Sequence, residues 1–322
     1  MDVRNPRQEE MREVFGLINN TFRKDLDPTM EIEFPLLFSD QNLPHIFIAK
    51  DSGQIVSHVA AYVTDLLIPG LKIRTGFLGA VATHPDFREK GHASKVLEAL
   101  EDQLIRESVE MILISGNRNL YLRRGFREMG KSMFFEIAGE EEEGLIPVEI
   151  EPLTPDLFQE VCHLYWAEDV RFRRTETDFS TLLQVHEQLL QEGPKSLEKA
   201  QIGPTYLVKA FGIYRGYFTF KADQSRIIEY AGSRISLLSG MEKLVRDGHP
   251  SFQLIIPESD LEFLNMLIFN HYSSTTSTYF PPNHTVKIVN SESLYERLGI
   301  MEDTRLTQFA LPPMPLPGFN FV

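Results

Sequence analysis

The chain has 322 residues, of which 42% are hydrophobic and 24% charged, a composition typical of a folded globular protein. Its 32 lysines and arginines against 46 aspartates and glutamates give a formal charge of −14, which argues against broad binding to nucleic acids or anionic membranes. The single cysteine, Cys162, excludes an internal disulfide and a cysteine-based metal site. Its apolar helical surroundings predict an inert core thiol.

The first residues carry no apolar run typical of a signal peptide, and no segment approaches the roughly 20 apolar residues of a membrane span, so we expect a cytoplasmic protein. Apolar residues at helical spacing predict a first helix over residues 8–23. Strand-like runs follow at 45–50, 55–67 and 73–83, and Asp51-Ser52-Gly53 predicts a hairpin turn between the first two.

The stretch from Val81 to Ser94 is the most informative part of the chain, because it combines the end of a strand, a tight loop and the start of a helix. Helical spacing marks that helix through Ala93, Val96, Leu97, Leu100, Leu104 and Ile105. A helix start presents unpaired amides and the positive end of the helix dipole, and Arg88 and Lys90 add positive charge beside it. We therefore predict a cradle for a pyrophosphate.

The rest of the first half predicts a strand over 110–115, a short helix over 120–124 and a final strand over 131–137 that completes a mixed sheet. A run of four glutamates between glycines follows and predicts a solvated linker. The resulting division is a first domain at 1–138, a linker at 139–147 and a second domain at 148–322.

The second half predicts a similar unit. Its expected helices span 155–169, 178–191, 235–246 and 261–270, and its expected strands span 205–210, 213–220, 226–230, 252–256 and 285–289. The segment Leu120–Phe126 matches Leu294–Ile300 at Leu, Tyr, Arg and Gly, which indicates a duplication. The predicted fold class is α/β with two units, each a mixed, mostly antiparallel sheet flanked by helices.

The loop Arg88-Glu89-Lys90-Gly91-His92-Ala93 follows Val-Ala-Thr-His-Pro on a strand, opens a helix and precedes a Leu-Tyr-x-Arg-x-Gly-Phe motif. In this context the loop resembles the Arg/Gln-x-x-Gly-x-Gly/Ala coenzyme loop of the GNAT superfamily of N-acetyltransferases, and the resemblance covers residues 1–138. The two-unit chain also partly resembles the enhanced-intracellular-survival type of tandem GNAT acetyltransferases, although it lacks the further C-terminal domain of those proteins.

The resemblance implies that acetyl-coenzyme A is a cosubstrate and that no metal takes part. It implies pairing of the pantetheine arm with the backbone of Val81 and Thr83, and binding of the pyrophosphate by loop amides. Gly91 and Ala93 suit this role because a large side chain would hold the phosphates away. His92 is expected to be a loop residue and not a base. The implied coenzyme-binding residues are Val81, Ala82, Thr83, Arg88, Glu89, Lys90, Gly91, His92, Ala93 and Ser94.

Tyr121 corresponds to the tyrosine that, in the GNAT enzymes this chain resembles, lies beside the coenzyme sulfur and protonates the departing thiolate. A phenol suits this role of general acid, because it is still protonated near neutral pH and its basicity is close to that of a thiolate. The alternative is that Tyr121 only packs against the sheet.

A general base is harder to assign, because the strand Phe77–Ala82 lacks the glutamate that some GNAT members carry there. Candidates, none favoured over water acting through a short relay, are His58, Asp65, His84 and the pair Glu31 and Glu33. The resemblance to the enhanced-intracellular-survival type implies that the C-terminal carboxylate is a further candidate base. The tail from Leu311 to Val322 is rich in proline and ends in apolar residues, which predicts that it docks on the protein.

At the corresponding strand-to-helix junction the second half has Glu229-Tyr230-Ala231-Gly232-Ser233-Arg234-Ile235, without the Arg-x-x-Gly-x-Ala pattern. Residues 148–322 therefore resemble a degenerate GNAT unit that no longer binds coenzyme and instead walls the acceptor pocket. A polar cluster near the start of this unit is expected to be a charged, solvated helix end and comprises Trp166, Asp169, Arg171, Arg173 and Arg174.

The expected activity is transfer of an acetyl group from acetyl-coenzyme A to an amine, by direct attack in a ternary complex. The acceptor stays open between small-molecule and peptide amines, and the negative charge favours a cationic one. The oligomeric state stays open as well. Two alternatives remain: a catalytically silent coenzyme-binding sensor or scaffold, and a structural partner without a coenzyme site.

Overall fold

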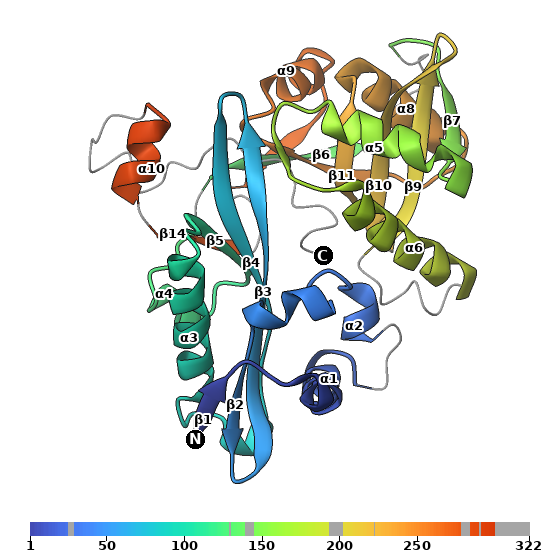
Figure 1. Ribbon diagram of the computed structural model, residues 1–322. Helices are drawn as coiled ribbons and strands as arrows, with labels where there is room; N and C mark the ends of the chain where they lie inside the picture. Colours follow the sequence, from blue (N-terminus) through green and yellow to red (C-terminus); the bar gives the residue numbers. More distant parts are fainter. Residues whose placement is uncertain are drawn as a thin grey trace.

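A long antiparallel hairpin, formed by Gln54–Ile68 and Leu71–Thr83, dominates the first half of the molecule and lies in the middle of the first sheet (Figure 1). The computed structural model describes residues 1–24, 29–128, 130–138, 145–192, 202–221, 223–277, 284–289 and 291–299. The glutamate run of the expected linker and the C-terminal tail therefore lie outside the described residues.

The first sheet is mixed and mostly antiparallel, because only β4 and β5 run parallel. This confirms the predicted sheet type. Its strands, in spatial order, are β1 (Asp2–Arg4), β2 (Ile46–Asp51), β3 (Gln54–Ile68), β4 (Leu71–Thr83), β5 (Met111–Ser115) and β14 (His284–Ile288), with β8 (Arg171–Phe172) paired to β3.

Turn chemistry and alternating apolar residues explain the hairpins. The turn between β2 and β3 consists of Ser52 and Gly53, both at positive φ (50° and 87°), as a two-residue hairpin turn requires. Along β3, Val59 and Ala61 face one apolar cluster while Ala60 faces another, so both faces of the sheet are buried.

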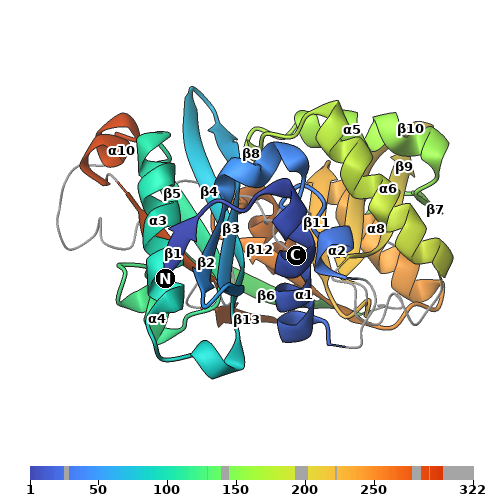
Figure 2. The ribbon, with the colours of Figure 1, turned by 60° about the horizontal axis from the view of Figure 1, so that its bottom comes forward.

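Helices cover both faces of the first sheet (Figures 1 and 2). The helix α3 (His92–Arg106) lies on one face and buries Val96, Leu97, Leu100 and Leu104, each worth about 2 kcal/mol. The helices α1 (Met11–Phe22) and α2 (Met30–Glu33) lie on the other. The remaining helical segments of this half are η1 (Gln8–Glu10), η2 (Asp40–His45), η3 (Pro85–Phe87) and α4 (Asn119–Leu122).

The second half contains two smaller sheets. One has the order β11 (Ile227–Gly232), β10 (Ile213–Lys221), β9 (Ile202–Ala210) and β7 (Glu149–Pro152), and the other has the order β12 (Phe252–Pro257), β6 (Ser132–Ile137) and β13 (Ser274–Ser277). The helices of this half are η4 (Pro155–Leu157), α5 (Phe158–Trp166), α6 (Glu176–Glu192), α8 (Arg234–Arg246), α9 (Leu261–Phe269) and α10 (Ser291–Arg297).

The two halves exchange strands. The expectation that residues 131–137 complete the first sheet is wrong, because β6 pairs with β12 and β13 of the second half. In return β14, from the second half, pairs with β5. The strand pairing thus crosses the expected boundary at residue 138, and the division into domains stays a prediction.

The order of elements in the second half repeats that of the first. Three antiparallel strands, β9 to β11, precede α8 and β12, just as β2 to β4 precede α3 and β5. The parallel contact between the third and fourth strand is a full pairing in the first half, but in the second half it is an isolated bridge between Arg226 and Gln253. The origin of this likeness by duplication stays a prediction.

Candidate active site

The junction between β4 and α3 leaves the start of a helix open. Gly91 precedes the helix in the left-handed conformation, at φ 83°, and no side chain caps the helix there. A Cβ atom built at Gly91 would meet nothing within 4 Å. Arg88 and Lys90 are exposed in the same loop. The junction therefore combines free space with positive charge.

The main-chain amides at this helix start are available to a ligand. The first bond of the helical ladder runs from Lys95 N–H to the carbonyl of Gly91, at 3.2 Å, so the amides of His92, Ala93 and Ser94 have no acceptor within the helix. Together with the helix dipole these amides favour a bound anion. The geometry thus fits the predicted phosphate cradle.

Beside this loop, β4 separates from β5. The two strands pair only from Thr75 to Leu78, so the edge of β4 beyond Leu78 is free of β5. At the same place β4 has a bulge, because Gly79 opposes Ala60 while Ala82 opposes His58. Such an open strand edge can pair with an extended ligand as an added strand would.

The end of β4 presents a carbonyl to this open edge. The His84 amide donates to the carbonyl of Val56, at 2.8 Å, so by antiparallel alternation the main chain of Thr83 points away from β3. The carbonyl of Thr83 instead accepts a hydrogen bond from Nε of Arg88, at 3.3 Å. A ligand that pairs with Thr83 would replace this exposed arginine contact.

Tyr121 lies in α4, which follows the open end of β5. Its side chain is 4% exposed and packs edge-on against Phe126, with ring centroids 6.3 Å apart. Burial raises the pKa of the Tyr121 phenol above its ordinary value, so the hydroxyl stays protonated at neutral pH. Among the residues that the structure describes, none hydrogen-bonds to this hydroxyl. Tyr121 is thus a buried proton donor without a partner in the described part of the fold.

The structure corrects the expectation for His92. It is the first residue of α3, and its imidazole is buried under the loop, with the Nε2 atom 3.6 Å from a carboxylate oxygen of Asp51. Its ring also lies edge-on to Phe87, with a centroid distance of 5.8 Å. The imidazole therefore belongs to the packing beneath the loop, and only the main-chain amide of His92 lies at the open start of the helix.

Four of the candidate bases have local partners. Glu33 is ion-paired to Arg23, and Glu31 accepts a hydrogen bond from Asn19 at 2.9 Å. Asp65 is buried, with one carboxylate oxygen 3.7 Å from Lys72 Nζ. The fourth, His84, accepts the amide of Asp86 at 3.3 Å and so takes part in the turn after β4.

His58, the remaining candidate, is buried beneath the bulge of β4. Its Nδ1 atom lies 2.8 Å from the carbonyl oxygen of Ala80, and its ring centroid lies 6.0 Å from that of Phe38. Burial lowers the pKa of His58 to about 4, although the contact with Ala80 opposes this shift, so the ring is neutral at pH 7. Because a carbonyl only accepts hydrogen bonds, the Nδ1 atom must carry the proton.

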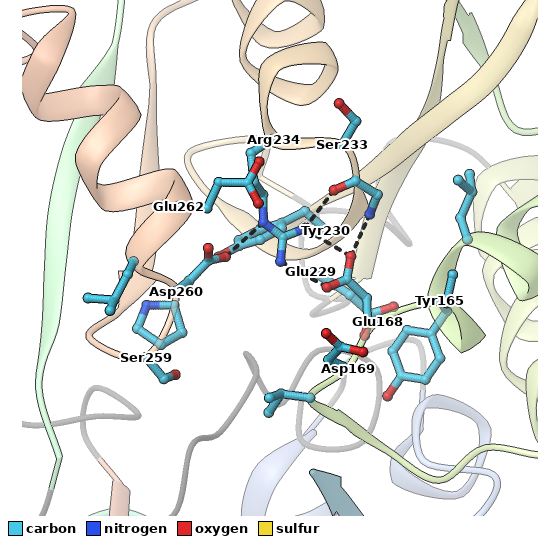
Figure 3. A pocket seen from close by; sticks show the side chains of 16 residues that line it. Tyr165, Glu168, Asp169, Glu229, Tyr230, Ser233, Arg234, Ser259, Asp260 and Glu262 are labelled. Atoms are coloured by element: carbon cyan, nitrogen blue, oxygen red, sulfur yellow. Dashed lines mark hydrogen bonds and ion pairs between the residues drawn. The ribbon is translucent and has the colours of Figure 1, made fainter. Parts of the chain in front are cut away.

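The corresponding junction in the second half is filled by a side chain (Figure 3). A carboxylate oxygen of Glu168 accepts the Gly232 amide at 2.6 Å, and both its oxygens accept hydrogen bonds from Arg234 at 2.9 and 2.8 Å. Arg234 also pairs with Asp260 at 3.0 Å. The network borders a cavity of about 570 Å³ whose acidic lining comprises Glu168, Asp169, Glu229, Asp260 and Glu262.

The polar cluster before this junction is only partly solvated. Asp169 and Arg173 are exposed as expected, but Arg174 is 3% exposed and donates to both carboxylate oxygens of Glu229, at 2.9 and 2.7 Å. Its guanidinium stacks over Tyr165 at 4.4 Å. The expectation of a solvated helix end is therefore wrong for Arg174, which forms a buried ion pair.

Cys162 is fully buried, and burial raises the pKa of its thiol to about 11, which confirms an inert core thiol. Within the ranges that the structure describes, no helix has both the length and the apolar character needed to cross a bilayer. Over the same ranges, no three His, Cys, Asp or Glu side chains are grouped as ligands for a metal ion.

The first half has known relatives. Residues 2–129 match the sequence family described as acetyltransferase (GNAT) domain. Over 110 residues the chain is 32% identical to the aminoglycoside 2'-N-acetyltransferase of Mycolicibacterium fortuitum, a match that covers 31% of this chain and 55% of that protein. Residues 2–129 are therefore a GNAT acetyltransferase domain. The chain spans about half the length of this relative.

Solved structures share the fold over both halves. A probable N-acyltransferase from Enterococcus faecalis has a TM-score of 0.66 at 17% identity, over 89% of this chain and 72% of its own. Eis1 from Mycobacterium abscessus has a TM-score of 0.64 at 13% identity, and the match covers 92% of this chain and 75% of that one. A GCN5-related N-acetyltransferase from Anabaena variabilis has a TM-score of 0.63 at 14% identity, and the match covers 90% of this chain and 73% of that one. At these identities the likeness is one of fold.

Proposed function

We propose that this protein is an N-acetyltransferase that moves an acetyl group from acetyl-coenzyme A to an amine. One observation carries the proposal: the uncapped start of α3 lies beside the open, bulged edge of β4. An anion site next to a free strand edge suits a ligand with a diphosphate and an extended amide chain, and coenzyme A has both. The family of residues 2–129 supports the same reading.

The coenzyme-binding residues are those of the loop and the strand end. The amides of His92, Ala93 and Ser94 would hold the pyrophosphate, with Gly91 leaving room for it. The backbone of Val81 and Thr83, at the free edge of β4, would pair with the pantetheine arm. The remaining proposed contacts are Ala82, Arg88, Glu89 and Lys90.

Tyr121 is the proposed general acid. Acetyl-coenzyme A supplies the acetyl group as a thioester, and main-chain amides of β4 would polarise its carbonyl. The amine nitrogen attacks that carbon, the C–S bond breaks, and the Tyr121 hydroxyl gives its proton to the departing sulfur. Burial keeps this phenol protonated at neutral pH, which is the state that the step requires.

The proton of the attacking amine would leave through water. Glu31, Glu33 and His84 are engaged with neighbours, as described above. Asp65 is buried with one carboxylate oxygen near Lys72 and Arg173, and His58 is buried at 0% exposure. The acceptor is proposed to be a cationic amine, because the chain carries a formal charge of −14 and its sequence relative is named for an aminoglycoside. The second half, whose own junction is filled by Glu168, is proposed to wall the acceptor site without binding coenzyme.

The test is release of free thiol from acetyl-coenzyme A by the full chain in the presence of an amine panel that includes aminoglycosides, polyamines and a lysine peptide. We expect thiol release that depends on the amine, together with a product heavier by one acetyl group in mass spectrometry. Coenzyme A binding without amine-dependent release across the panel would overturn the proposed activity.

A catalytically silent coenzyme-binding sensor is the second candidate, since each of the described candidate bases has local contacts or is buried; these are Glu31, Glu33, His58, Asp65 and His84. The same assay separates the two functions. Calorimetric titration with coenzyme A then tests the third reading, a structural partner, because that reading requires that the loop Arg88–Ala93 bind no coenzyme.

A further inference from the structure

The bulge of β4 is in a strained conformation that one side chain supports. Ala80 has φ 52°, in the left-handed region, which is unfavourable for a residue with a Cβ atom. The carbonyl oxygen of Ala80 lies 2.8 Å from Nδ1 of His58, on the neighbouring strand. Since the neutral ring carries its proton on Nδ1, His58 donates to this carbonyl and stabilises the left-handed turn.

That hydrogen bond also sets the direction of the next amide. The peptide unit between Ala80 and Val81 is planar and trans, so its N–H points opposite to its C=O. A carbonyl held toward His58 directs the Val81 amide away from His58. If Ala80 relaxed to the extended conformation of the surrounding strand, the same peptide plane would turn and carry the Val81 amide with it.

The surroundings indicate that the histidine is kept for this donor. His58 is 0% exposed, and among the described residues its Nε2 atom has no hydrogen-bond partner. A buried acceptor without a partner lowers the stability of the fold, and an apolar side chain at this position would avoid that loss. Packing alone would therefore favour an apolar side chain over the imidazole of His58. The imidazole supplies what an apolar side chain lacks, a rigid and buried N–H donor.

We propose that His58 is a positioning residue, which holds the carbonyl of Ala80 so that the Val81 amide is aimed at the acetyl carbonyl of the bound thioester. The inference rests on the proposed function, because the thioester belongs to it. His58 acts here through the backbone of β4 and touches no substrate. Its effect is expected in the chemical step more than in coenzyme binding, because the pyrophosphate contacts lie at the start of α3.

Two substitutions separate donation from packing. His58→Phe keeps an aromatic ring but has no donor, whereas His58→Asn places an amide N–H near the position of Nδ1. For His58→Phe we expect kcat to fall about 30-fold while KM for acetyl-coenzyme A changes less than about threefold, since one misaimed donor affects the transition state more than binding. His58→Asn should recover at least a third of wild-type kcat.

Hydrogen exchange of the free protein gives a readout that does not need activity. Peptides spanning 78–83 should exchange about tenfold faster in His58→Phe than in wild type, and His58→Asn should lie close to wild type. Wild type without thiol release would end the proposed function, and exchange would still decide the role of His58 at the bulge. Three results would each overturn the inference: equal kcat losses in the two variants, wild-type kcat in His58→Phe, or unchanged exchange of these peptides. Near-UV circular dichroism serves as the control that both variants fold.

Discussion

The two strand-to-helix junctions of this protein share a topology and differ in what meets the helix. At the first, Gly91 leaves the start of α3 uncapped and faces free space. At the second, the carboxylate of Glu168 accepts the Gly232 amide and pairs with Arg234. Neither helix start has a side-chain cap, but the second half places a carboxylate of its own at the end of the strand before the helix, whereas the first half leaves the corresponding space open.

The groups buried beneath the two junctions differ as well. Below the first, His58 is neutral and donates one hydrogen bond to the strand. Below the second, Arg174 and Glu229 form a buried ion pair that Tyr217 extends with a hydrogen bond to Glu229 at 2.7 Å. At the first junction, His58 alone supports the strained strand β4, whose edge is open. At the second junction, the network around Glu229 holds β11.

The largest expected effect contrasts two glycines. A Cβ at Gly232 would lie 2.2 Å from the carbonyl oxygen of Arg215, so Gly232→Val should lower the free energy of unfolding by about 4 kcal/mol or more. Gly91→Val meets only free space and a cost of roughly 1–2 kcal/mol for its left-handed φ, but should raise the Kd for coenzyme A about 100-fold. Denaturant unfolding and calorimetric titration of both variants test the contrast. Wild-type coenzyme affinity in Gly91→Val would remove the proposed cradle.

Acid should weaken the first junction through His58. Its pKa is about 4 in the folded protein and about 6.5 in the unfolded chain, so between these pH values only the unfolded chain binds the proton. The contribution of neutral His58 to the free energy of unfolding is therefore complete above pH 6.5. It should be lost as the pH falls from 6.5 to 4, by about 3 kcal/mol in total. Urea unfolding at pH 7 and pH 4 should show this loss in wild type but not in His58→Phe. Parallel losses in both proteins would contradict the assignment.

The next effect concerns the two tyrosines of the repeated motif. Tyr121→Phe should lower kcat about 100-fold and leave the Kd for coenzyme A nearly unchanged, because it removes only the proposed proton donor. Tyr295→Phe, at the matching position of the second half, is the control and should stay within about twofold of wild type in kcat. Steady-state kinetics decide the matter. Comparable losses in both variants would point to packing and not to proton transfer.

The smallest expected effect tests the internal carboxylate. Glu168→Ala removes the acceptor of the Gly232 amide and one of the two carboxylate partners of Arg234, which keeps Asp260, and this should lower the free energy of unfolding by about 2 kcal/mol. Because an anion can take the place of the lost carboxylate, sulfate should raise the melting temperature of Glu168→Ala more than that of wild type. Equal sulfate effects on the two proteins would show that this junction has no anion site to fill.

Local chemistry made much of the fold predictable. The hairpin at Ser52 and Gly53 follows from turn residues that adopt positive φ, and α3 follows from its apolar spacing. The open helix start at Gly91 was predictable for the same reason, because loop, glycine and helix are neighbours in sequence. Short strands such as β1, β7 and β13 were missed, since three or four residues carry too little periodicity.

Features that join distant residues were not predictable. Nothing in residues 131–137 distinguishes a strand that completes its own sheet from one that joins β12 and β13, because alternation specifies a face and not a neighbour. The burial of Arg174 depends on Glu229, and that of His92 on contacts with Asp51 and Met1. The signal for Arg174 was a lone glutamate within an apolar strand, which requires a buried partner.

The exchange of β6 and β14 bears on how the protein is made. While the chain emerges from the ribosome, β5 has no neighbour on its outer edge until β14 is synthesised, and β6 has no sheet until β12 follows. The first half therefore cannot complete its sheet until β14 is synthesised, and the outer edge of β5 stays open to wrong strand pairing until then. Each half therefore depends on a strand of the other half to complete one of its sheets.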